Sequence, residues 1–318
     1  MTIVVLGSSG RLGRAVAANL QGMKLTAHAI GRPNFNLLTP TREELDISVE
    51  EQLLDYLRPL PNNTVIVNCA ALTNVGEIQK ETPLDPPSFT INERPVYTLA
   101  RWSSTRKSHS VIHVSSCYVF NDGTYDASRY NLEDDMWVLG NCLYGEGKRR
   151  AENHLLHNSE SYIIVRTDNF FGGIGKTKIF TEKIVDQLVN EEIRELKVTK
   201  THYTTPTGVS SLAVFIAELA YNRVYSPYHE LDRYVIHPMY EIDATSTYYD
   251  MAREIARITH SDKPILCEDD GLQFDRGGRP NVILIGNTVI GTNPYSELRL
   301  SVREYLTRLG KKHTMYMR

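Results

Sequence analysis

The N-terminal segment VVLGSSGRLGRAV constrains the fold more than any other stretch of the chain. An apolar run over residues 2–6 ends at Gly7, and a segment with apolar residues at helical spacing follows it. Between them, Gly7, Gly10 and Gly13 form a GxxGxxG pattern. In a strand–turn–helix unit, such glycines permit a tight turn, close approach of a pyrophosphate and packing of the helix on the strand. The pattern predicts a dinucleotide-binding turn, with a plain glycine-rich turn as the alternative.

Strand-like and helix-like segments alternate along the first half of the chain. Apolar runs typical of strands cover residues 2–7, 25–31, 63–71, 110–116 and 161–172. Helical spacing of apolar residues covers 10–21, 48–60, 92–107 and 143–158. This alternation predicts an α/β fold with a Rossmann-like, doubly wound parallel sheet. We expect an NAD(P)-binding Rossmann domain over 1–171, completed by part of 200–238, and a smaller, interleaved substrate-binding domain, mainly 172–318.

Composition narrows the possible functions. The 318 residues include 41% hydrophobic residues and carry a formal net charge of −3, so the sequence has enough apolar residues for a core and no basic excess for nucleic acid. The four cysteines form no CxxC pair, which argues against a zinc site or a redox pair and favours reduced thiols in a cytoplasmic protein. His154 and His157 lack a third ligand, so no metal is expected. The N-terminus resembles neither a signal peptide nor a membrane span.

The segment AIGRPN bears on the choice of cofactor. If residues 25–31 form the second strand, Arg32 stands where an acid would bind the ribose 2′-hydroxyl of NAD. An arginine there favours NADP(H), with NAD(H) or a solvated surface arginine as the alternatives. Further along, GKT at 175–177 resembles the end of a P-loop, but Phe170 occupies the place of the first glycine that this motif needs.

The segment NCLYGEGKRRAE contains a candidate catalytic pair. Tyr144 and Lys148 are four residues apart, so on a helix they share one face. An ammonium near the phenol would lower the pKa of the tyrosine and suit it to proton transfer, although such a pair also occurs by chance. The strand at 110–116 should bring Ser115 or Ser116 to the same edge of the sheet. A serine, a tyrosine and a lysine are the elements of a hydride-transfer site.

Five motifs in order, VLGSSGRLG, VNCAALT, INERPVYTLA, VIHVSSCYVF and YGEGKRRAE, resemble the extended short-chain dehydrogenase/reductases. Within these the chain looks most like the dTDP-4-dehydrorhamnose reductase family, whose Ser-Thr-Asp-Tyr-Val-Phe run and YGxxKxxGE motif correspond to 115–120 and 144–152. The resemblance implies reduction of the 4-keto group of a nucleotide-linked 6-deoxysugar by NADPH. It makes Ser116 the catalytic hydroxyl, Tyr144 the general acid, and Lys148 the residue that tunes Tyr144 and binds the ribose.

The remaining site residues are expected in two groups. The cofactor-binding group consists of Gly7, Ser9, Gly10, Arg11, Leu12, Gly13, Arg32, Asp46, Ile47, Asn68, Cys69, Ala70, Ala71, Asn92, Tyr144 and Lys148. The substrate-binding group consists of Cys117, Tyr118 and Asn169. The expected partner is a nucleotide sugar, and a homodimer is left open; neither nucleic acid nor a membrane is expected.

Three positions depart from the pattern of this family. Gly76 stands where an aspartate is usual, Cys117 replaces the aspartate of the serine strand, and Asn169 replaces a tryptophan. A cysteine near the site resembles the GDP-fucose synthase group, where it assists epimerisation, and the asparagine resembles nucleotide-sugar epimerases and dehydratases. An epimerase or dehydratase therefore remains an alternative. A non-catalytic regulatory subunit, similar to that of methionine adenosyltransferase, is another.

Overall fold

The computed structural model describes residues 1–31, 33–82, 86–106, 108–126, 142–225, 233–241, 246–267, 282–286 and 288–310. Its main helices are α1 (Arg11–Ala29), α2 (Glu50–Leu57), α5 (Arg94–Ser104), α6 (Leu143–Asn158), α7 (Phe180–Val189), α8 (Val209–Tyr225), α9 (Tyr248–Thr259) and α10 (Pro294–Arg308). Two single-turn helices, α3 (Val75–Ile78) and α4 (Phe89–Asn92), precede α5, and a 3₁₀ turn covers Cys117–Val119.

A six-stranded parallel sheet forms the centre of the molecule. Its order is β11 (Arg233–Ile236), β6 (Tyr162–Thr167), β4 (Ser110–Ser116), β3 (Thr64–Asn68), β1 (Thr2–Leu6) and β2 (Asn36–Leu38). The order reverses direction after β1 and β2, as in a doubly wound sheet. The prediction of a Rossmann-like α/β fold is confirmed. The last strand, β11, comes from the second half of the chain; the boundary between the two expected domains stays a prediction.

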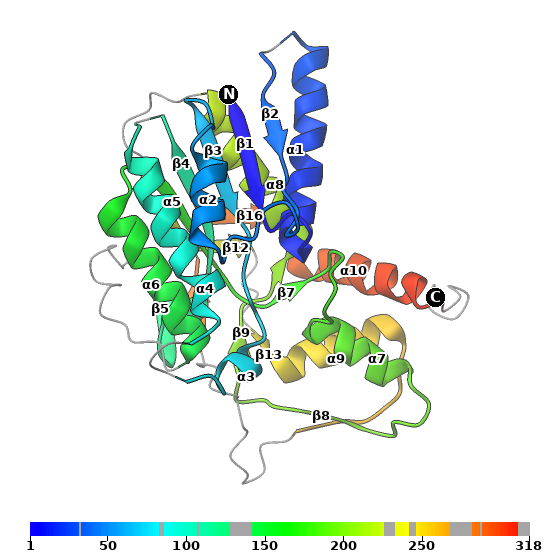
Figure 1. Ribbon diagram of the computed structural model, residues 1–318. Helices are drawn as coiled ribbons and strands as arrows, with labels where there is room; N and C mark the ends of the chain where they lie inside the picture. The colour runs from blue at the N-terminus through cyan, green and yellow to red at the C-terminus, as the bar shows by residue number, and fades with distance from the viewer. Residues whose placement is uncertain are drawn as a thin grey trace.

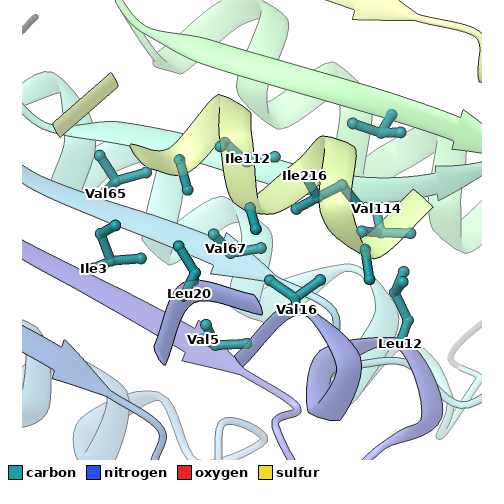
Figure 2. Close-up of a cluster of buried hydrophobic side chains, with 14 of the residues drawn as sticks. Ile3, Val5, Leu12, Val16, Leu20, Val65, Val67, Ile112, Val114 and Ile216 are labelled. Carbon is teal, nitrogen blue, oxygen red and sulfur yellow. The ribbon is translucent and has the colours of Figure 1, made fainter. Parts of the chain in front are cut away.

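Helices cover both faces of the sheet, and the strand residues alternate between them. Ile3 and Val5 of β1 belong to a buried cluster that includes α1 and α8, whereas Val4 and Leu6 belong to a cluster with α2, α5 and α6. Figure 2 shows the first cluster, with Val16 on α1 and other side chains from α8 above the strands. Strands buried on both faces explain why the sequence shows continuous apolar runs instead of alternation.

The predicted strand at residues 25–31 is wrong. The segment forms the last turns of α1, which ends only at Ala29, and the second strand is β2 at 36–38. Val16, Leu20, Met23 and Ala27 are spaced by four, three and four residues and turn toward the core, so helical periodicity continues through this segment. The short run read as a strand is the end of one amphipathic helix.

The second half of the chain builds a smaller layer below the sheet. Figure 1 shows β1, β3 and β4 running from the N-terminal side toward the region of α7, α9 and α10. This region has its own core, formed by the inward faces of these three helices and the strand pair β8 (Leu196–Val198) and β14 (Ile265–Cys267). The carboxyl ends of the parallel strands therefore face this second layer, which is where ligands bind in doubly wound sheets.

Short strand pairs join the two layers. They are β7 (Phe170–Phe171) with β10 (Thr207–Gly208), β9 (Tyr203–Thr204) with β13 (Ser246–Thr247), β12 (Pro238–Tyr240) with β16 (Thr288–Gly291), and β5 (Gly123–Asp126) with β15 (Val282–Ile285). Only the β9–β13 pair is antiparallel. Within the described ranges, no helix combines the length and the apolar character that a membrane crossing needs.

Candidate active site

The glycine turn after β1 leaves no room for side chains. Gly7 has a φ of +76°, a left-handed conformation that favours glycine. A Cβ at this residue would lie 2.7 Å from the backbone nitrogen of Ala70. A Cβ at Gly13 would lie 2.3 Å from the carbonyl oxygen of Gly7, so the first turn of α1 rests directly on the loop. The turn therefore holds the strand, the helix and the segment after β3 in contact.

The N-terminus of α1 is open to an anion. Gly10 is the N-cap, no side chain caps the helix, and its first turn contains no acidic residue. Ser9 and Gly10 are exposed at this end. The first N–H groups of a helix lack partners within the helix, and the helix dipole gives them partial positive charge, so they suit a pyrophosphate. These residues fit the dinucleotide cofactor that the sequence predicts.

The Arg11 side chain supports the fold beside this turn. Its guanidinium forms a buried ion pair with Glu182 of α7 at 2.9 Å. It also donates to the carbonyl oxygens of Gly172, Gly173 and Thr177, so the GKT segment lies beside the start of α1. The side chain is thus occupied by protein partners, and only the backbone N–H of Arg11 keeps the predicted cofactor role.

The segment after β3 is built as a second wall of the same site. The Asn68 side-chain oxygen accepts from the Ala70 N–H at 3.1 Å. The Asn92 amide bonds both backbone groups of Leu72, accepting from its N–H at 2.8 Å and donating to its carbonyl at 3.0 Å. The Asn92 side chain therefore fixes this segment, and its contact with a cofactor stays a prediction. Burial raises the pKa of the Cys69 thiol to about 12, so it stays protonated.

The second strand ends later in the sequence than predicted, so other residues than Arg32 lie where the ribose site is expected. Because β2 ends at Leu38, the residues that follow it beside the glycine turn are Thr39 and Pro40, and Arg42 comes two residues later. The Ser8 hydroxyl donates to the carbonyl of Thr39 at 3.2 Å, which places the two loops together. Arg32 lies outside the described residues, and the strand assignment on which its role rested is wrong.

The two remaining cofactor candidates in this region belong to the loop before α2. Asp46 accepts from the N–H and hydroxyl of Ser48, and these hydrogen bonds hold the pKa of its carboxyl below the usual value. Ile47 packs partly against the cluster under α2. Their contact with a cofactor stays a prediction.

The predicted catalytic hydroxyls meet at the carboxyl end of β4. Ser116 is the last residue of β4, Tyr144 is the second residue of α6, and a side-chain hydrogen bond links them. The Tyr118 N–H donates to Ser116 Oγ at 3.2 Å. A Cβ at Gly145 would lie 1.9 Å from the Tyr118 carbonyl oxygen, so a glycine after Tyr144 allows α6 to begin against the 3₁₀ turn. The glycine of the YG motif thus brings tyrosine and serine together.

Lys148 lies one helical turn beyond Tyr144 and is 2% exposed. Its ammonium donates to the Val114 carbonyl of β4 at 2.8 Å, and it lies close enough to Cys69 to interact with its thiol. Burial lowers the pKa of Lys148 to about 8, although the Glu152 carboxylate opposes this shift. The lysine thus connects α6 with β4 and with the wall after β3.

The expected effect of Lys148 on Tyr144 is wrong for this structure. Burial raises the pKa of Tyr144 above its ordinary value, and the neighbouring Cys117 and Cys142 add to the rise. The hydrogen bond from Ser116 acts in the opposite direction but is the weakest influence. The phenol therefore carries its proton at neutral pH, which is the form a proton donor needs.

The predicted substrate-side residues surround this pair. Cys117 is buried and hydrogen-bonded to Asp168, and burial, with the Asp168 charge, raises the pKa of its thiol well above the usual value. The Tyr118 ring lies edge-on to Tyr144, with centroids 6.2 Å apart. The Asn169 amide donates to Thr204 Oγ1 at 3.0 Å and to the hydroxyl of Tyr248.

Sequence reasoning missed Asp168 and Tyr248. Tyr248 begins α9 and bonds both Asn169 and Tyr118, so it reaches the site from a distant part of the chain. A local signal existed in the capping box that starts at Thr247, which predicts a helix N-terminus at this point. Asp168 directly follows β6 and therefore stands at the carboxyl edge of the sheet, beside the predicted Asn169.

A buried charge network supports the pair from below. The Glu152 carboxylate accepts from Arg166 at 2.6 Å and from the Ser115 hydroxyl. Both charged side chains are nearly inaccessible, and the Arg166 guanidinium lies 5.0 Å from the centroid of the Phe120 ring. The network ties α6, β4 and β6 together under the site. Among the described residues, no cluster of three or more His, Cys, Asp or Glu side chains is arranged to hold a metal.

Comparison with known proteins identifies relatives of this chain. A curated relative from Streptomyces antibioticus, named as a probable dTDP-4,6-dihydroxy-2-methyloxan-3-one 4-ketoreductase, is 24% identical over 96% of this chain and 94% of its own. The dTDP-4-keto-6-deoxy-D-glucose reductase of Streptomyces niveus is 29% identical over 81% of this chain and 79% of its own. The NADP complex of the Bacillus anthracis dTDP-4-dehydrorhamnose reductase superimposes with a TM-score of 0.72, at 19% identity over 95% and 99% of the two chains.

The match to a protein family covers most of the chain. The sequence profile described as the RmlD substrate binding domain matches residues 1–276. That range includes the glycine turn, the Ser116–Tyr144 pair and Lys148, and it extends into the second layer. The chain belongs to the RmlD substrate binding domain family.

Proposed function

We propose that this protein is an NADPH-dependent reductase of a nucleotide-linked 4-keto-6-deoxysugar. The observation that carries the proposal is the hydrogen-bonded pair Ser116 and Tyr144 at the edge of the sheet where the glycine turn also lies. Both Streptomyces relatives are named as reductases of dTDP-linked 4-keto compounds. These names support a nucleotide-linked 4-ketosugar as the substrate class. A homodimer and a cytoplasmic location stay predictions.

The cofactor would be held by backbone groups and one lysine. The N–H groups at the start of α1 suit the pyrophosphate, and the wall from Asn68 to Ala71 suits the nicotinamide half. Lys148 would bind the nicotinamide ribose. Bound NADPH supplies the hydride that reduces the carbonyl carbon.

The protein supplies the proton and stabilises the developing charge. As the carbonyl carbon accepts the hydride, its oxygen gains negative charge. Tyr144 Oη gives its proton to this oxygen, and the Ser116 hydroxyl donates a hydrogen bond to it. Since burial raises the pKa of Tyr144, the phenol holds this proton ready at neutral pH. The phenolate formed in this step is less stable than in water until Lys148 or solvent compensates its charge.

Arg42 is our candidate for recognition of the 2′-phosphate of NADPH. It lies after β2, on the side of the sheet where Ser8 contacts Thr39. Its guanidinium is 73% exposed and pairs only loosely with Asp46, at 3.3 Å. An exposed arginine at this point suits a phosphate, and its weak ion pair costs little to break.

The structure of the substrate side favours a reductase over an epimerase. An epimerase that uses Cys117 as a base would need its thiolate, but burial and the nearby Asp168 raise the pKa of this thiol. The Asn169 amide, which resembles the epimerases, is engaged with Thr204 and Tyr248. Cys117 therefore serves better as a hydrogen-bonding group than as a base.

The test is consumption of NADPH with a panel of 4-keto-6-deoxysugars carrying dTDP, UDP, GDP or CDP. We expect one NADPH to be consumed for each ketone reduced. Tyr144→Phe should lower kcat by about 10²–10⁴-fold, because it removes the proton donor, while NADPH still binds. Product formation without net NADPH consumption would indicate the epimerase or dehydratase, and normal turnover by Tyr144→Phe would contradict the assignment of the acid.

A further inference from the structure

One departure from the pattern of the serine strand lies beside a carboxylate that follows the neighbouring strand. Cys117 stands where an aspartate is usual, and Asp168 follows β6, the strand paired with β4. Ser116 and Thr167 are register partners, so Cys117 and Asp168 leave the sheet as neighbours. A side-chain hydrogen bond joins them. The carboxylate that is missing from the serine strand is thus present on the adjacent strand.

Asp168 is held firmly in this place. Its Oδ1 accepts from the Asn169 N–H at 2.7 Å. Its Oδ2 accepts from Thr204 Oγ1 at 3.0 Å and from the Thr205 N–H at 2.5 Å. Besides these three donors, the carboxylate has the Cys117 thiol as a neighbour; an ionised carboxylate can only accept, so the thiol is the donor between the two.

The hydrogen bonds continue from Cys117 to the catalytic pair. Ser116 bonds the sulfur of Cys117 on one side and the phenol of Tyr144 on the other. Ser116 Oγ already accepts from the Tyr118 N–H. A thiol that donates to Asp168 does not compete for Ser116 Oγ, so the Ser116 proton remains available to Tyr144 or to a substrate oxygen.

We propose that Asp168 is a positioning residue of the reduction, which orders the chain Asp168–Cys117–Ser116–Tyr144 and so orients the Ser116 hydroxyl toward the reacting oxygen. The proposal rests on the proposed reductase function. It gives Cys117 a role as the link between a carboxylate and the catalytic serine. The other role open to Asp168 is purely structural, since it also holds the loop at Thr204 and Thr205.

A double-mutant cycle separates the two roles. We expect Asp168→Asn and Cys117→Ala each to lower kcat about tenfold, as for the loss of one hydrogen bond to a charged group, with KM changed less. If both act through one chain, the double variant should be no slower than the slower single variant. If Asp168 acts only through the loop, its loss should be the same whether residue 117 is Cys or Ala, and the two losses should multiply. Multiplying losses, or normal kcat for Asp168→Asn, overturn the proposal.

The pH profile of kcat gives a second readout. Burial raises the pKa of Asp168, and its titratable neighbours are Cys117 and Tyr118, with Tyr248 bonded to the latter. On acidification Asp168 gains a proton and ceases to be a pure acceptor, so kcat of the natural protein should fall on the acid side. Asp168→Asn should lack this acid limb, and an unchanged limb contradicts the proposal.

Controls distinguish a loss of this hydrogen-bonded chain from misfolding and from a protein that is not a reductase. Cys267→Ala removes a thiol from β14, in the second layer, and should leave kcat and the pH profile unchanged. Each variant should keep its affinity for NADPH, and kcat should be compared well below the thermal midpoint of each variant. A natural protein that reduces none of the ketosugars overturns the proposed function and this inference together; an active protein with multiplying losses overturns this inference alone.

Discussion

The buried Glu152–Arg166 pair allows a strong prediction about stability. Side-chain exposure is 2% for Glu152 and 3% for Arg166, and Arg166 approaches the carboxylate through two nitrogens, at 2.6 and 3.1 Å. Glu152→Gln keeps the shape but removes the negative charge. Arg166 is then left buried without its counter-charge, and breaking a buried pair in this way costs about 3–5 kcal/mol. Such a loss is a large part of a typical free energy of unfolding, which is about 5–15 kcal/mol.

The same helix provides a matched control. Glu146 pairs with Arg149 and Arg150 at 2.8 Å, but its side chain is 20% exposed and that of Arg150 is 48% exposed. Glu146→Gln should therefore cost about 1 kcal/mol or less.

Urea unfolding followed by circular dichroism measures both variants under identical conditions. Equal midpoints for Glu152→Gln and Glu146→Gln would refute the reasoning. If the pair matters through its charge, Glu152→Leu combined with Arg166→Met should recover most of the loss, because the buried guanidinium is then removed together with its counter-charge.

Three further predictions concern the site. Gly145→Ala places a Cβ 1.9 Å from the Tyr118 carbonyl oxygen, so it should cost about 1–3 kcal/mol of stability and lower kcat more than it raises KM. Gly22→Ala is the control, because open space surrounds this residue and the substitution should not destabilise the fold. Thermal unfolding and steady-state kinetics check both variants. Arg42→Ala should weaken NADPH binding about tenfold and leave NADH binding unchanged, as calorimetry would measure; equal losses for both cofactors would contradict a role at the 2′-phosphate. Burial lowers the pKa of Lys148 to about 8, so its ammonium is present below that pH and lost above it. The affinity for NADPH should therefore fall as the pH rises through about 8, and Lys148→Met should bind NADPH weakly at every pH without this fall. A parallel fall in the variant would assign the titration to another group.

Local sequence signals predicted the parts of the site that lie on one continuous segment. The glycine turn combines β1, three glycines and the start of α1 within a few residues, and α6 covers the residues predicted for it, Leu143 to Asn158. Strand β4 likewise covers the predicted 110–116. In each case a strong periodicity and a turn residue agree, and tertiary contacts need only preserve what the segment already favours.

The second strand shows where this reasoning fails. The segment 25–31 contains alternating apolar residues, but it follows a helix whose buried positions continue in register to Ala27. The true strand, β2, has three residues and forms only because the edge of β1 is available to it. Since a short edge strand has little pattern of its own, its position follows from pairing with a neighbour, and the cofactor candidate moved from Arg32 to Arg42 with it.

The electrostatic properties of the site depend on burial, which spacing alone does not reveal. Tyr144 and Lys148 lie four residues apart as predicted, yet the phenol and the ammonium are governed by the low polarity around them rather than by each other. Asp168 and Tyr248 arrive from β6 and α9, so their contacts with Cys117 and Tyr118 exist only when both layers are in place. If these contacts determine which sugar is reduced, then Tyr248→Phe, which removes one hydroxyl from the second layer, should raise KM for the sugar more than it lowers kcat; a loss in kcat alone would place Tyr248 with the reacting groups instead.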